Sequence, residues 1–258
     1  MLRILDKNKV PVKGLRKYSD LCIENSIELD DKTLTFSVPY RNVRSAIAVE
    51  GYIETKDDRF VVKEIEKSSE GTATITAQLD LESLEGKPFR AFKSEEQTIK
   101  ATLQLAFAGT GWTVGECRIL KKRTLSMANV SALDVLKQAL KTYRAEIKID
   151  SKKQSIDIYP EVGSDKGVYF SDQLNLRKLT VQYSTYDFYT EIEPYGKDGL
   201  TIETVNSGKT YLENHQYSSK KKRCIWKDER YTIADSLKED AAAKLADMSK
   251  PYVSYSAD

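Results

Sequence analysis

The clearest hydrophobic pattern in the chain is a pair of amphipathic segments near its middle. Ser94 and Gln97 have the spacing of a capping box, and the apolar residues of Ile99–Phe107 then fall on one helical face. Gly109 is expected to end this helix, because glycine adopts the left-handed conformation at low cost. A second amphipathic helix is predicted from about residue 131 to residue 143. Two helices separated by a glycine-rich turn therefore occupy the centre of the sequence.

Before these helices, apolar and polar residues alternate with a period of two. The alternation is clearest from Leu34 to Val38, and it stops at Pro39, which has no N–H to give to a sheet. Short predicted strands cover residues 2–5, 10–12, 21–24, 34–38, 51–55, 60–65 and 72–79, and residues 80–88 are expected to be a linker. Many short strands with polar turns predict an antiparallel barrel or sandwich.

The pattern returns to strands after the second helix. Residues 146–150 and 155–159 are predicted to form a hairpin, in which Ile147 and Ile149 share a face with Ile156 and Ile158. With the two helices, this hairpin forms a small α+β module.

A second β-rich region is expected from near Leu176. Its predicted strands are residues 179–183 and 188–192, a tight turn at residues 196–199, and a hairpin of residues 201–205 and 209–212. A last helix is predicted from Thr232, capped by Asp235, to Met248, and a short strand at residues 253–255 follows it.

The fold class predicted from this order is α+β, mainly β. We expect three domains: an N-terminal antiparallel β-barrel-like domain over residues 1–90, a central α+β module over residues 91–170, and a second β-barrel-like domain over residues 171–258. The 258 residues are 40% hydrophobic and 31% charged, which is polar for one large core. Several small cores, or subunits that bury surface against each other, fit this composition better.

The charge balance argues against two classes of partner. The formal net charge is +2, so no strong field directs the chain toward nucleic acid or acidic lipid. Lys220–Arg223 is the one basic run, and we interpret it as a solvated strand edge protected by its lysines. No segment approaches the ~20 apolar residues that cross a bilayer, and no signal peptide is visible. A soluble protein made in a reducing cytoplasm is expected.

The sequence offers no recognisable catalytic, cofactor-binding or metal-ligating set. Cys22, Cys117 and Cys224 are far apart and are expected to be buried free thiols, since zinc sites need paired spacings. His215 is the one histidine and lies in a polar segment without an evident partner. Residues 109–115 resemble a phosphate loop only in glycine content, so we expect a helix-ending turn with Trp112 packed beneath it.

Tyrosines are concentrated in the second β-rich region. Aromatic residues are enriched at subunit interfaces, and tyrosine also favours strands. We therefore predict a subunit interface there, while sugar stacking on exposed rings stays open as an alternative. The candidate interface residues are Tyr183, Tyr186, Tyr189, Tyr195 and Tyr211.

Several segments occur in an order and spacing similar to those of one phage protein family. These segments are residues 1–6, 109–115, 175–179, 195–200 and 211–214. Together they resemble the N-terminal region of phage minor structural proteins, also called the prophage endopeptidase tail or tail-associated lysin family. The resemblance extends over nearly the whole chain.

The resemblance implies a hub-like protein at the tail tip. Family members look like the baseplate hub of contractile-tailed phages, in which two β-barrel domains are joined by an α+β part and three copies form a ring. It further implies a homotrimer in the virion tail tip, made in the cytoplasm of a bacterial host. The distal tail protein and the tape-measure protein are the implied partners.

Two further expectations concern activity and the C-terminal end. Longer family members carry a peptidoglycan-degrading or receptor-facing region, which is not expected here, so no enzyme activity is predicted; a cell-wall hydrolase stays the alternative. The second barrel is expected to be incomplete, either as part of a longer tail protein or because a partner supplies strands. Its last strand, near Val253–Tyr255, is then expected to be poorly ordered or paired with a neighbouring chain.

Overall fold

The structure, a computed structural model, describes residues 1–25, 32–167, 169, 171 and 177–257. The chain divides into two compact units. The first contains residues 1–93, 97–122 and 127–162, and the second contains residues 94–96, 123–126 and 163–258. Each unit is described separately. Leu176, where the second β-rich region was predicted to begin, lies outside the described residues.

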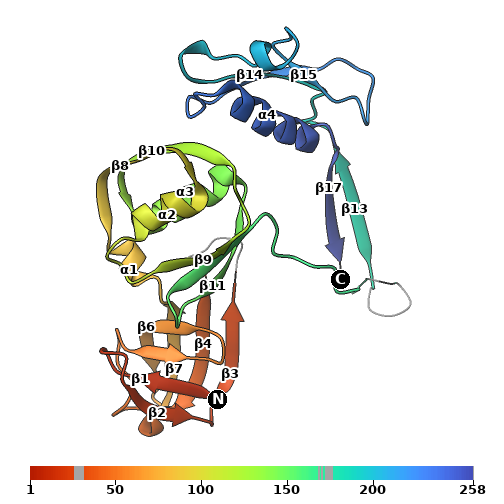
Figure 1. Cartoon of the computed structure of the whole chain (residues 1–258). Helices are drawn as coiled ribbons and strands as arrows, with labels where there is room; N and C mark the ends of the chain where they lie inside the picture. Colours follow the sequence, from red (N-terminus) through yellow and green to blue (C-terminus); the bar gives the residue numbers. More distant parts are fainter. Residues whose placement is uncertain (26–31, 168, 170, 172–176, 258) are drawn as a thin grey trace. The chain divides into compact units, whose positions relative to one another are not determined.

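A seven-stranded antiparallel sheet forms the N-terminal part of the first unit (Figure 1). Its spatial order is β2-β1-β5-β6-β7-β4-β3. The strands are β1 (Leu2–Leu5), β2 (Pro11–Leu15), β3 (Ser19–Glu24), β4 (Thr33–Pro39), β5 (Tyr52–Glu54), β6 (Arg59–Lys67) and β7 (Thr72–Leu79). β2 and β3 are the two edges although only three residues separate them in sequence, and the sheet curls into a half-barrel.

The predicted alternation explains the core of this sheet. Along β4, Leu34, Phe36 and Val38 are buried, while their neighbours are partly exposed. β7 buries alternate residues in the same way, and β6 adds Phe60. The predicted strands of the N-terminal region are therefore confirmed, with small shifts of their ends.

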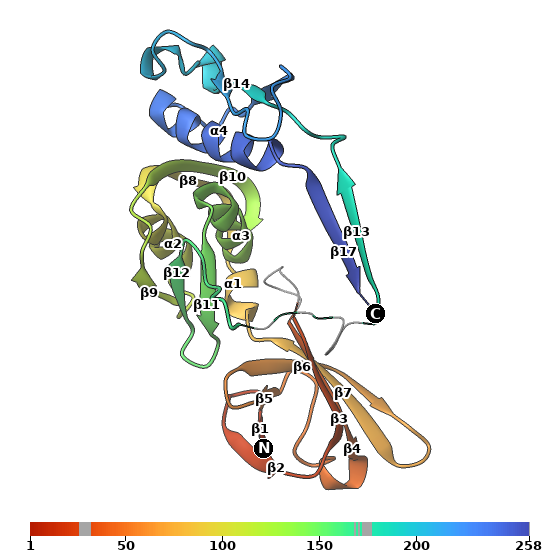
Figure 2. The same ribbon diagram turned by 90° about the vertical axis from the view of Figure 1, so that its right-hand side faces the viewer.

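Most of the rest of the first unit is a small α+β module, seen again in Figure 2, although residues 94–96 of β8 and 123–126 of β10 belong to the second unit. The helices are α1 (Glu82–Glu85), α2 (Ile99–Phe107) and α3 (Ala132–Tyr143), and the strands are β8 (Pro88–Thr98), β9 (Thr113–Cys117), β10 (Lys122–Ser131), β11 (Glu146–Asp150) and β12 (Ser155–Tyr159). β11 and β12 form the predicted hairpin, with Ile147 opposite Ile158 and Ile149 opposite Ile156. Trp112 is buried as predicted, and its Nε1 donates to Ser83 Oγ at 3.0 Å.

One prediction in this module is wrong and two are incomplete. Ser94 and Gln97 lie in β8, which pairs with β10, and α2 instead begins after Thr98, whose side chain accepts from the N–H of Ala101. The expected linker contains α1, because Leu84 is buried. The expected turn follows α2, with Gly109 at φ of 80°, but its last residues belong to β9, which pairs in parallel with β12. At Ser94 and in β9, contacts distant in sequence outweigh the local signal.

The described residues of the second unit form two small sheets and one long helix. Its elements are β13 (Leu179–Ser184), β14 (Glu191–Tyr195), β15 (Leu212–Glu213), β16 (Arg223–Lys227), α4 (Ala234–Met248), β17 (Tyr252–Ala257) and the 3-10 turns η2 (Lys197–Gly199) and η3 (Glu203–Val205). β14 lies between β15 and β16, and β13 pairs with β17. α4 covers the three-stranded sheet, where Ala241 and Leu245 pack on Ile192.

Some predicted details of this unit are also wrong. The expected hairpin of residues 201–205 and 209–212 is replaced by η3, because Ile202 is buried with Tyr231 and Leu237. α4 begins after Ile233 without a side-chain cap, so the expected cap by Thr232 and Asp235 does not form.

The C-terminal strand lies beside another strand of its own chain. β17 is described to Ala257 and pairs antiparallel with β13. The two strands are suited to pair because both are uncharged and alternate apolar with polar residues, and they match each other over six residues. The expected pairing of this end with a neighbouring chain stays a prediction.

The cysteines form no disulfide, but their burial differs from the prediction. Cys22 is exposed, because it lies on the edge strand β3, and Cys117 and Cys224 are half-buried. Within the described part of the chain, no helix is long and apolar enough to span a membrane.

Candidate subunit interface

The five tyrosines predicted for the interface lie in different parts of the second unit. Tyr183 is on β13 and is 71% exposed, and Tyr186, in the following loop, is 91% exposed. Tyr189, Tyr195 and Tyr211 are half-buried around the three-stranded sheet. The structure therefore separates two exposed rings from three rings that the unit itself partly covers.

The half-buried tyrosines have polar and cationic neighbours within the unit. Tyr195 donates its hydroxyl hydrogen to Glu193 Oε1 at 3.0 Å, and this hydrogen bond raises the pKa of Tyr195 and lowers that of Glu193. The Arg223 guanidinium carbon lies 3.7 Å from the centre of the Tyr211 ring, and Lys222 Nζ lies 4.7 Å from that of Tyr189. These three rings therefore make their contacts within the second unit, around its three-stranded sheet.

A group of exposed apolar side chains also lies on the ribbon formed by β13 and β17. Val181 lies opposite Tyr255, and Tyr183 lies opposite Val253. Because residues directly opposite each other and residues two apart share a face, these four side chains lie on one face of the ribbon. Val181 is 37% and Tyr255 69% exposed.

Sequence reasoning placed only one ribbon residue, Tyr183, in the interface. It predicted β17 as a strand but did not connect Val253 or Tyr255 with β13. The alternation of apolar and uncharged polar residues in both strands was the available signal. Their pairing, across about seventy intervening residues, could not be deduced from that signal because many strands were possible partners.

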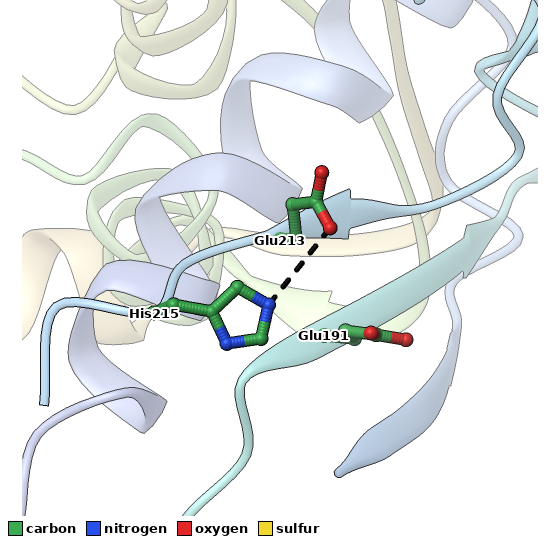
Figure 3. A group of neighbouring side chains, drawn as sticks. All are labelled: Glu191, Glu213 and His215. Carbon is green, nitrogen blue, oxygen red and sulfur yellow. Dashed lines mark ion pairs between the residues drawn. The ribbon is translucent and has the colours of Figure 1, made fainter. Parts of the chain in front are cut away.

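His215 lies beside two glutamates rather than alone in a loop (Figure 3). One ligand atom each of Glu191, Glu213 and His215 lies within 4.8 Å of the others. The His215 Nε2 is 3.8 Å from Glu213 Oε2, while its Nδ1 is 3.1 Å from the carbonyl oxygen of Ser218. An imidazole and two carboxylates are the ligand types of a zinc or manganese site.

The surrounding cations argue that this cluster is an ion-pair network. The buried Glu191 accepts from Arg223 Nε at 2.8 Å. Glu213 pairs with Lys209 at 3.2 Å, and this contact lowers the pKa of Glu213. A divalent cation would have to compete with both positive side chains, so the donor set fits a metal poorly.

Another charged cluster is buried beneath α4. Arg123 donates from Nε to Asp240 Oδ2 at 3.0 Å and from Nη2 to Glu239 Oε2 at 2.8 Å. Tyr231 donates its hydroxyl hydrogen to the same Asp240 oxygen at 2.8 Å. Burial, with the neighbouring Asp240, raises the pKa of Tyr231 strongly. The groups satisfy one another, which indicates a role in holding α4.

Three family models match consecutive stretches of the chain. The prophage endopeptidase tail N-terminal domain matches residues 2–79, the prophage endopeptidase tail domain matches residues 88–158, and the prophage endopeptidase tail model matches residues 164–258. The three models thus account for almost every residue in one order.

A curated protein and two solved structures are similar over most of the chain. The SPbeta prophage-derived uncharacterized protein YomG of Bacillus subtilis strain 168 is 20% identical over 244 residues, which cover 84% of this chain and 27% of that protein. The prophage tail protein gp18 of Listeria monocytogenes matches with a TM-score of 0.76 and 17% identity, over 98% of this chain and 79% of gp18. The 43 kDa tail protein of prophage MuSo2 from Shewanella oneidensis gives 0.64 and 12%, over 99% and 82%.

At 17% and 12% sequence identity, the similarity to the two solved structures shows that this chain shares their fold. The chain spans about a quarter of the length of the curated relative.

Proposed function

The chain belongs to the prophage endopeptidase tail family, and from this premise we propose that it is a structural hub at the tip of a phage or prophage tail. Membership makes it a prophage tail protein. The proposal adds a position in the tail and a structural role, in which the hub connects the tail tube or distal tail protein to the machinery of the tip.

The observation that carries the proposal is the match of fold along the whole chain. A curled seven-stranded sheet, an α+β module and a second β-containing unit follow one another, and a prophage tail protein has the same fold over 98% of this chain. Consecutive family matches also support domains at residues 1–90, 91–170 and 171–258 as part of this proposal.

The proposed assembly is a homotrimer in the virion tail. A ring of three copies gives each copy the same contacts and leaves two faces for different neighbours. The distal tail protein and the tape-measure protein are the proposed neighbours. Tyr183 and Tyr186 support the assembly, because large exposed aromatic side chains are typical of interface residues.

Light scattering tests the proposal directly. The purified protein should have three times the chain mass of 29.3 kDa, with dissociation on dilution. Co-expression with the distal tail protein of the same prophage should retain both proteins on one affinity column. A monomeric mass at every concentration, together with no retained tail protein, would overturn the hub proposal.

We further propose that the chain itself does not cleave peptidoglycan. Its one histidine is positioned by Ser218 and Glu213 rather than beside a nucleophile, and its thiols are not paired with it. Incubation with purified cell walls should leave the supernatant unchanged. Soluble muropeptides released by the pure protein would show that the hydrolase alternative is correct.

Carbohydrate binding is the second candidate function. Tyr183, Tyr252 and Tyr255 are about 70% exposed, and exposed rings can stack on sugars. A glycan array carrying cell-wall oligosaccharides distinguishes the two functions, because a structural hub should leave every position of the array empty.

A further inference from the structure

The half-barrel of the first unit, formed by β1 to β7, has one end that adjoins the α+β module. There the backbone N–H of Arg59 donates to Ser151 Oγ of the module at 2.8 Å, and Lys152 Nζ donates to the carbonyl oxygen of Lys56 at 2.7 Å. Several cations of this module end are neutralised by buried carboxylates. The ion pairs are Lys9 with Asp80 at 2.9 Å, Lys32 with Asp58 at 2.7 Å and Arg59 with Glu54 at 3.1 Å.

Separate segments of the chain bring cations together at the opposite end of the half-barrel. Pro39, the last residue of β4, lies opposite Thr72, the first residue of β7. The 3-10 turn η1 (Tyr40–Asn42) follows Pro39, and Lys13 Nζ of β2 donates to the carbonyl oxygen of Asn42 at 2.6 Å. The cations gathered here, which we call the distal basic end, are Lys13, Arg16, Lys17, Arg41, Arg44 and Lys67.

The distal basic end differs from the module end in its charge balance. Its cations are exposed, and within the described residues none of them has a carboxylate at ion-pair distance. Lys67 instead places Nζ 4.5 Å from the centre of the Tyr40 ring, so its charge is not neutralised. Exposed acids on β3, on β6 and in the turn after β6 are fewer than these cations, which leaves this end positive. These acids are Asp20, Glu66 and Glu70.

We infer that the distal basic end is a docking surface for an acidic face of another protein. The inference rests on the proposed hub function and deepens it, because it names the surface that meets a neighbouring tail protein and the charge that this protein presents. Opposite potentials across an interface speed association and select the correct partner. The guanidinium groups of Arg16, Arg41 and Arg44 are suited to bind carboxylates through two hydrogen bonds each.

A protein partner fits the distal basic end better than a nucleic acid does. A DNA duplex presents an unbroken row of phosphates, with one negative charge per about 1.7 Å of its axis. Asp20, Glu66 and Glu70 lie among the cations and would repel such a row. A protein surface can place carboxylates opposite the arginines and a cation opposite each acid, so the mixed pattern selects an acidic protein.

The test reverses two charges at the distal basic end and two at the module end. Arg41→Glu with Arg44→Glu changes the distal basic end. Lys7→Glu with Lys56→Glu gives the same change in net charge, at exposed positions in the turns before β2 and before β6. Circular dichroism with a melting curve shows whether each double variant is folded.

The first probe is the distal tail protein of the same prophage, whose binding is measured by interferometry. The Arg41/Arg44 variant should bind it at least about tenfold more weakly, because each substitution replaces an attraction by a repulsion. The Lys7/Lys56 variant should bind like the wild type. Binding by the wild type should weaken as sodium chloride is raised, since salt screens exposed charges.

The second probe is fluorescent poly-L-glutamate, with a DNA duplex beside it, and binding is followed by fluorescence anisotropy. This probe tests the distal basic end without any tail protein. Binding of poly-L-glutamate that the Arg41/Arg44 variant loses and the Lys7/Lys56 variant keeps supports an acidic protein partner.

The outcomes separate this inference from the hub function. If the Arg41/Arg44 variant binds the distal tail protein as tightly as the wild type, the inference is wrong and the hub proposal stands. A wild type that does not bind the distal tail protein counts against the hub proposal, and poly-L-glutamate then decides the inference alone, where no binding overturns it. Tighter binding of the DNA duplex through the same arginines would show that the partner is a nucleic acid and that the inference is wrong.

Discussion

Arg123 illustrates how single residues fix the second unit. Its side chain is 5% exposed, and it is held by Asp240 and Glu239 of α4. A guanidinium buried in this way is tolerated because its hydrogen bonds to carboxylates replace those to water. Tyr231 completes the arrangement through Asp240.

Arg123→Ala should lower the free energy of unfolding by about 3–5 kcal/mol, because it removes the guanidinium that pairs with the buried Asp240 carboxylate. Urea unfolding followed by circular dichroism measures the change. Arg118→Ala, which removes an exposed pair with Glu116, is the control and should leave the melting temperature unchanged. Equal effects of the two variants would show that the buried network is unimportant for stability.

Tyr231 makes stability depend on pH in the alkaline range. Its pKa is raised in the folded state by burial and by Asp240, so the contribution is complete below the unfolded pKa of about 10 and is lost as pH rises above it. Wild-type stability should therefore fall more steeply between neutral and alkaline pH than that of Tyr231→Phe, which cannot ionise. Denaturant titrations of both proteins across this range measure the difference. Parallel curves would contradict the assignment.

Local sequence signals determine some elements and fail for others. Ser131 forms a capping box with Asp134 at the start of α3. Ser94 and Gln97 have a similar pattern, yet they lie in β8. The difference is that β8 pairs with β10. The backbone near Ser94 and Gln97 is therefore part of a sheet, and no helix begins at Ser94.

Ser131→Ala should destabilise the protein by about 1 kcal/mol, because the N–H of Asp134 loses its acceptor. Ser131→Thr retains a hydroxyl and should remain close to the wild type. Thermal melting of the three proteins makes the comparison. A wild-type melting temperature for Ser131→Ala would mean that tertiary packing alone starts α3.

The turn after β14 depends on one glycine. A Cβ at Gly196 would lie 2.7 Å from the backbone oxygen of Tyr231, which accepts from the N–H of Lys197. Gly196→Ala should therefore cost about 1–3 kcal/mol through overpacking. At Gly14 of β2 a Cβ would meet only Met1 Sδ, at 4.0 Å. Gly14→Ala is the matched control, and unfolding titrations that rank it equal to Gly196→Ala would contradict the prediction.

At the scale of the molecule, the distribution of charge matters more than the total. The net charge is +2, and charged residues are frequent throughout, yet the β13–β17 ribbon has none. If the proposed homotrimer buries this ribbon, its assembly depends on the burial of apolar side chains.

Self-association should therefore not weaken as sodium chloride is raised, because the screening of charges does not reach an uncharged contact. Sulfate should strengthen it, since excluded salts favour apolar burial. Sedimentation velocity at several salt concentrations measures the effect. Dissociation in sodium chloride would point to an interface built from the charged surface instead.

The sequence by itself determined the strands of the half-barrel, the hairpin of β11 and β12, and the helices α3 and α4. Each of these strands alternates strictly between apolar and polar residues, and each of these helices has its apolar residues on one face. Such a segment keeps its secondary structure whichever core its apolar face packs against. It also determined the family, because several short motifs in a fixed order are more specific than any one of them.

Only the tertiary structure decided which strands meet. The pairing of β9 with β12, of β8 with β10, and of β13 with β17 joins segments that are separated along the chain. Each strand carries the same alternation as many others, so its partner is selected by burial and by the backbone groups left unpaired elsewhere. The candidate interface followed the same rule: the tyrosines were visible in the sequence, but the exposed ribbon exists only because residues 179–184 and 252–257 come together.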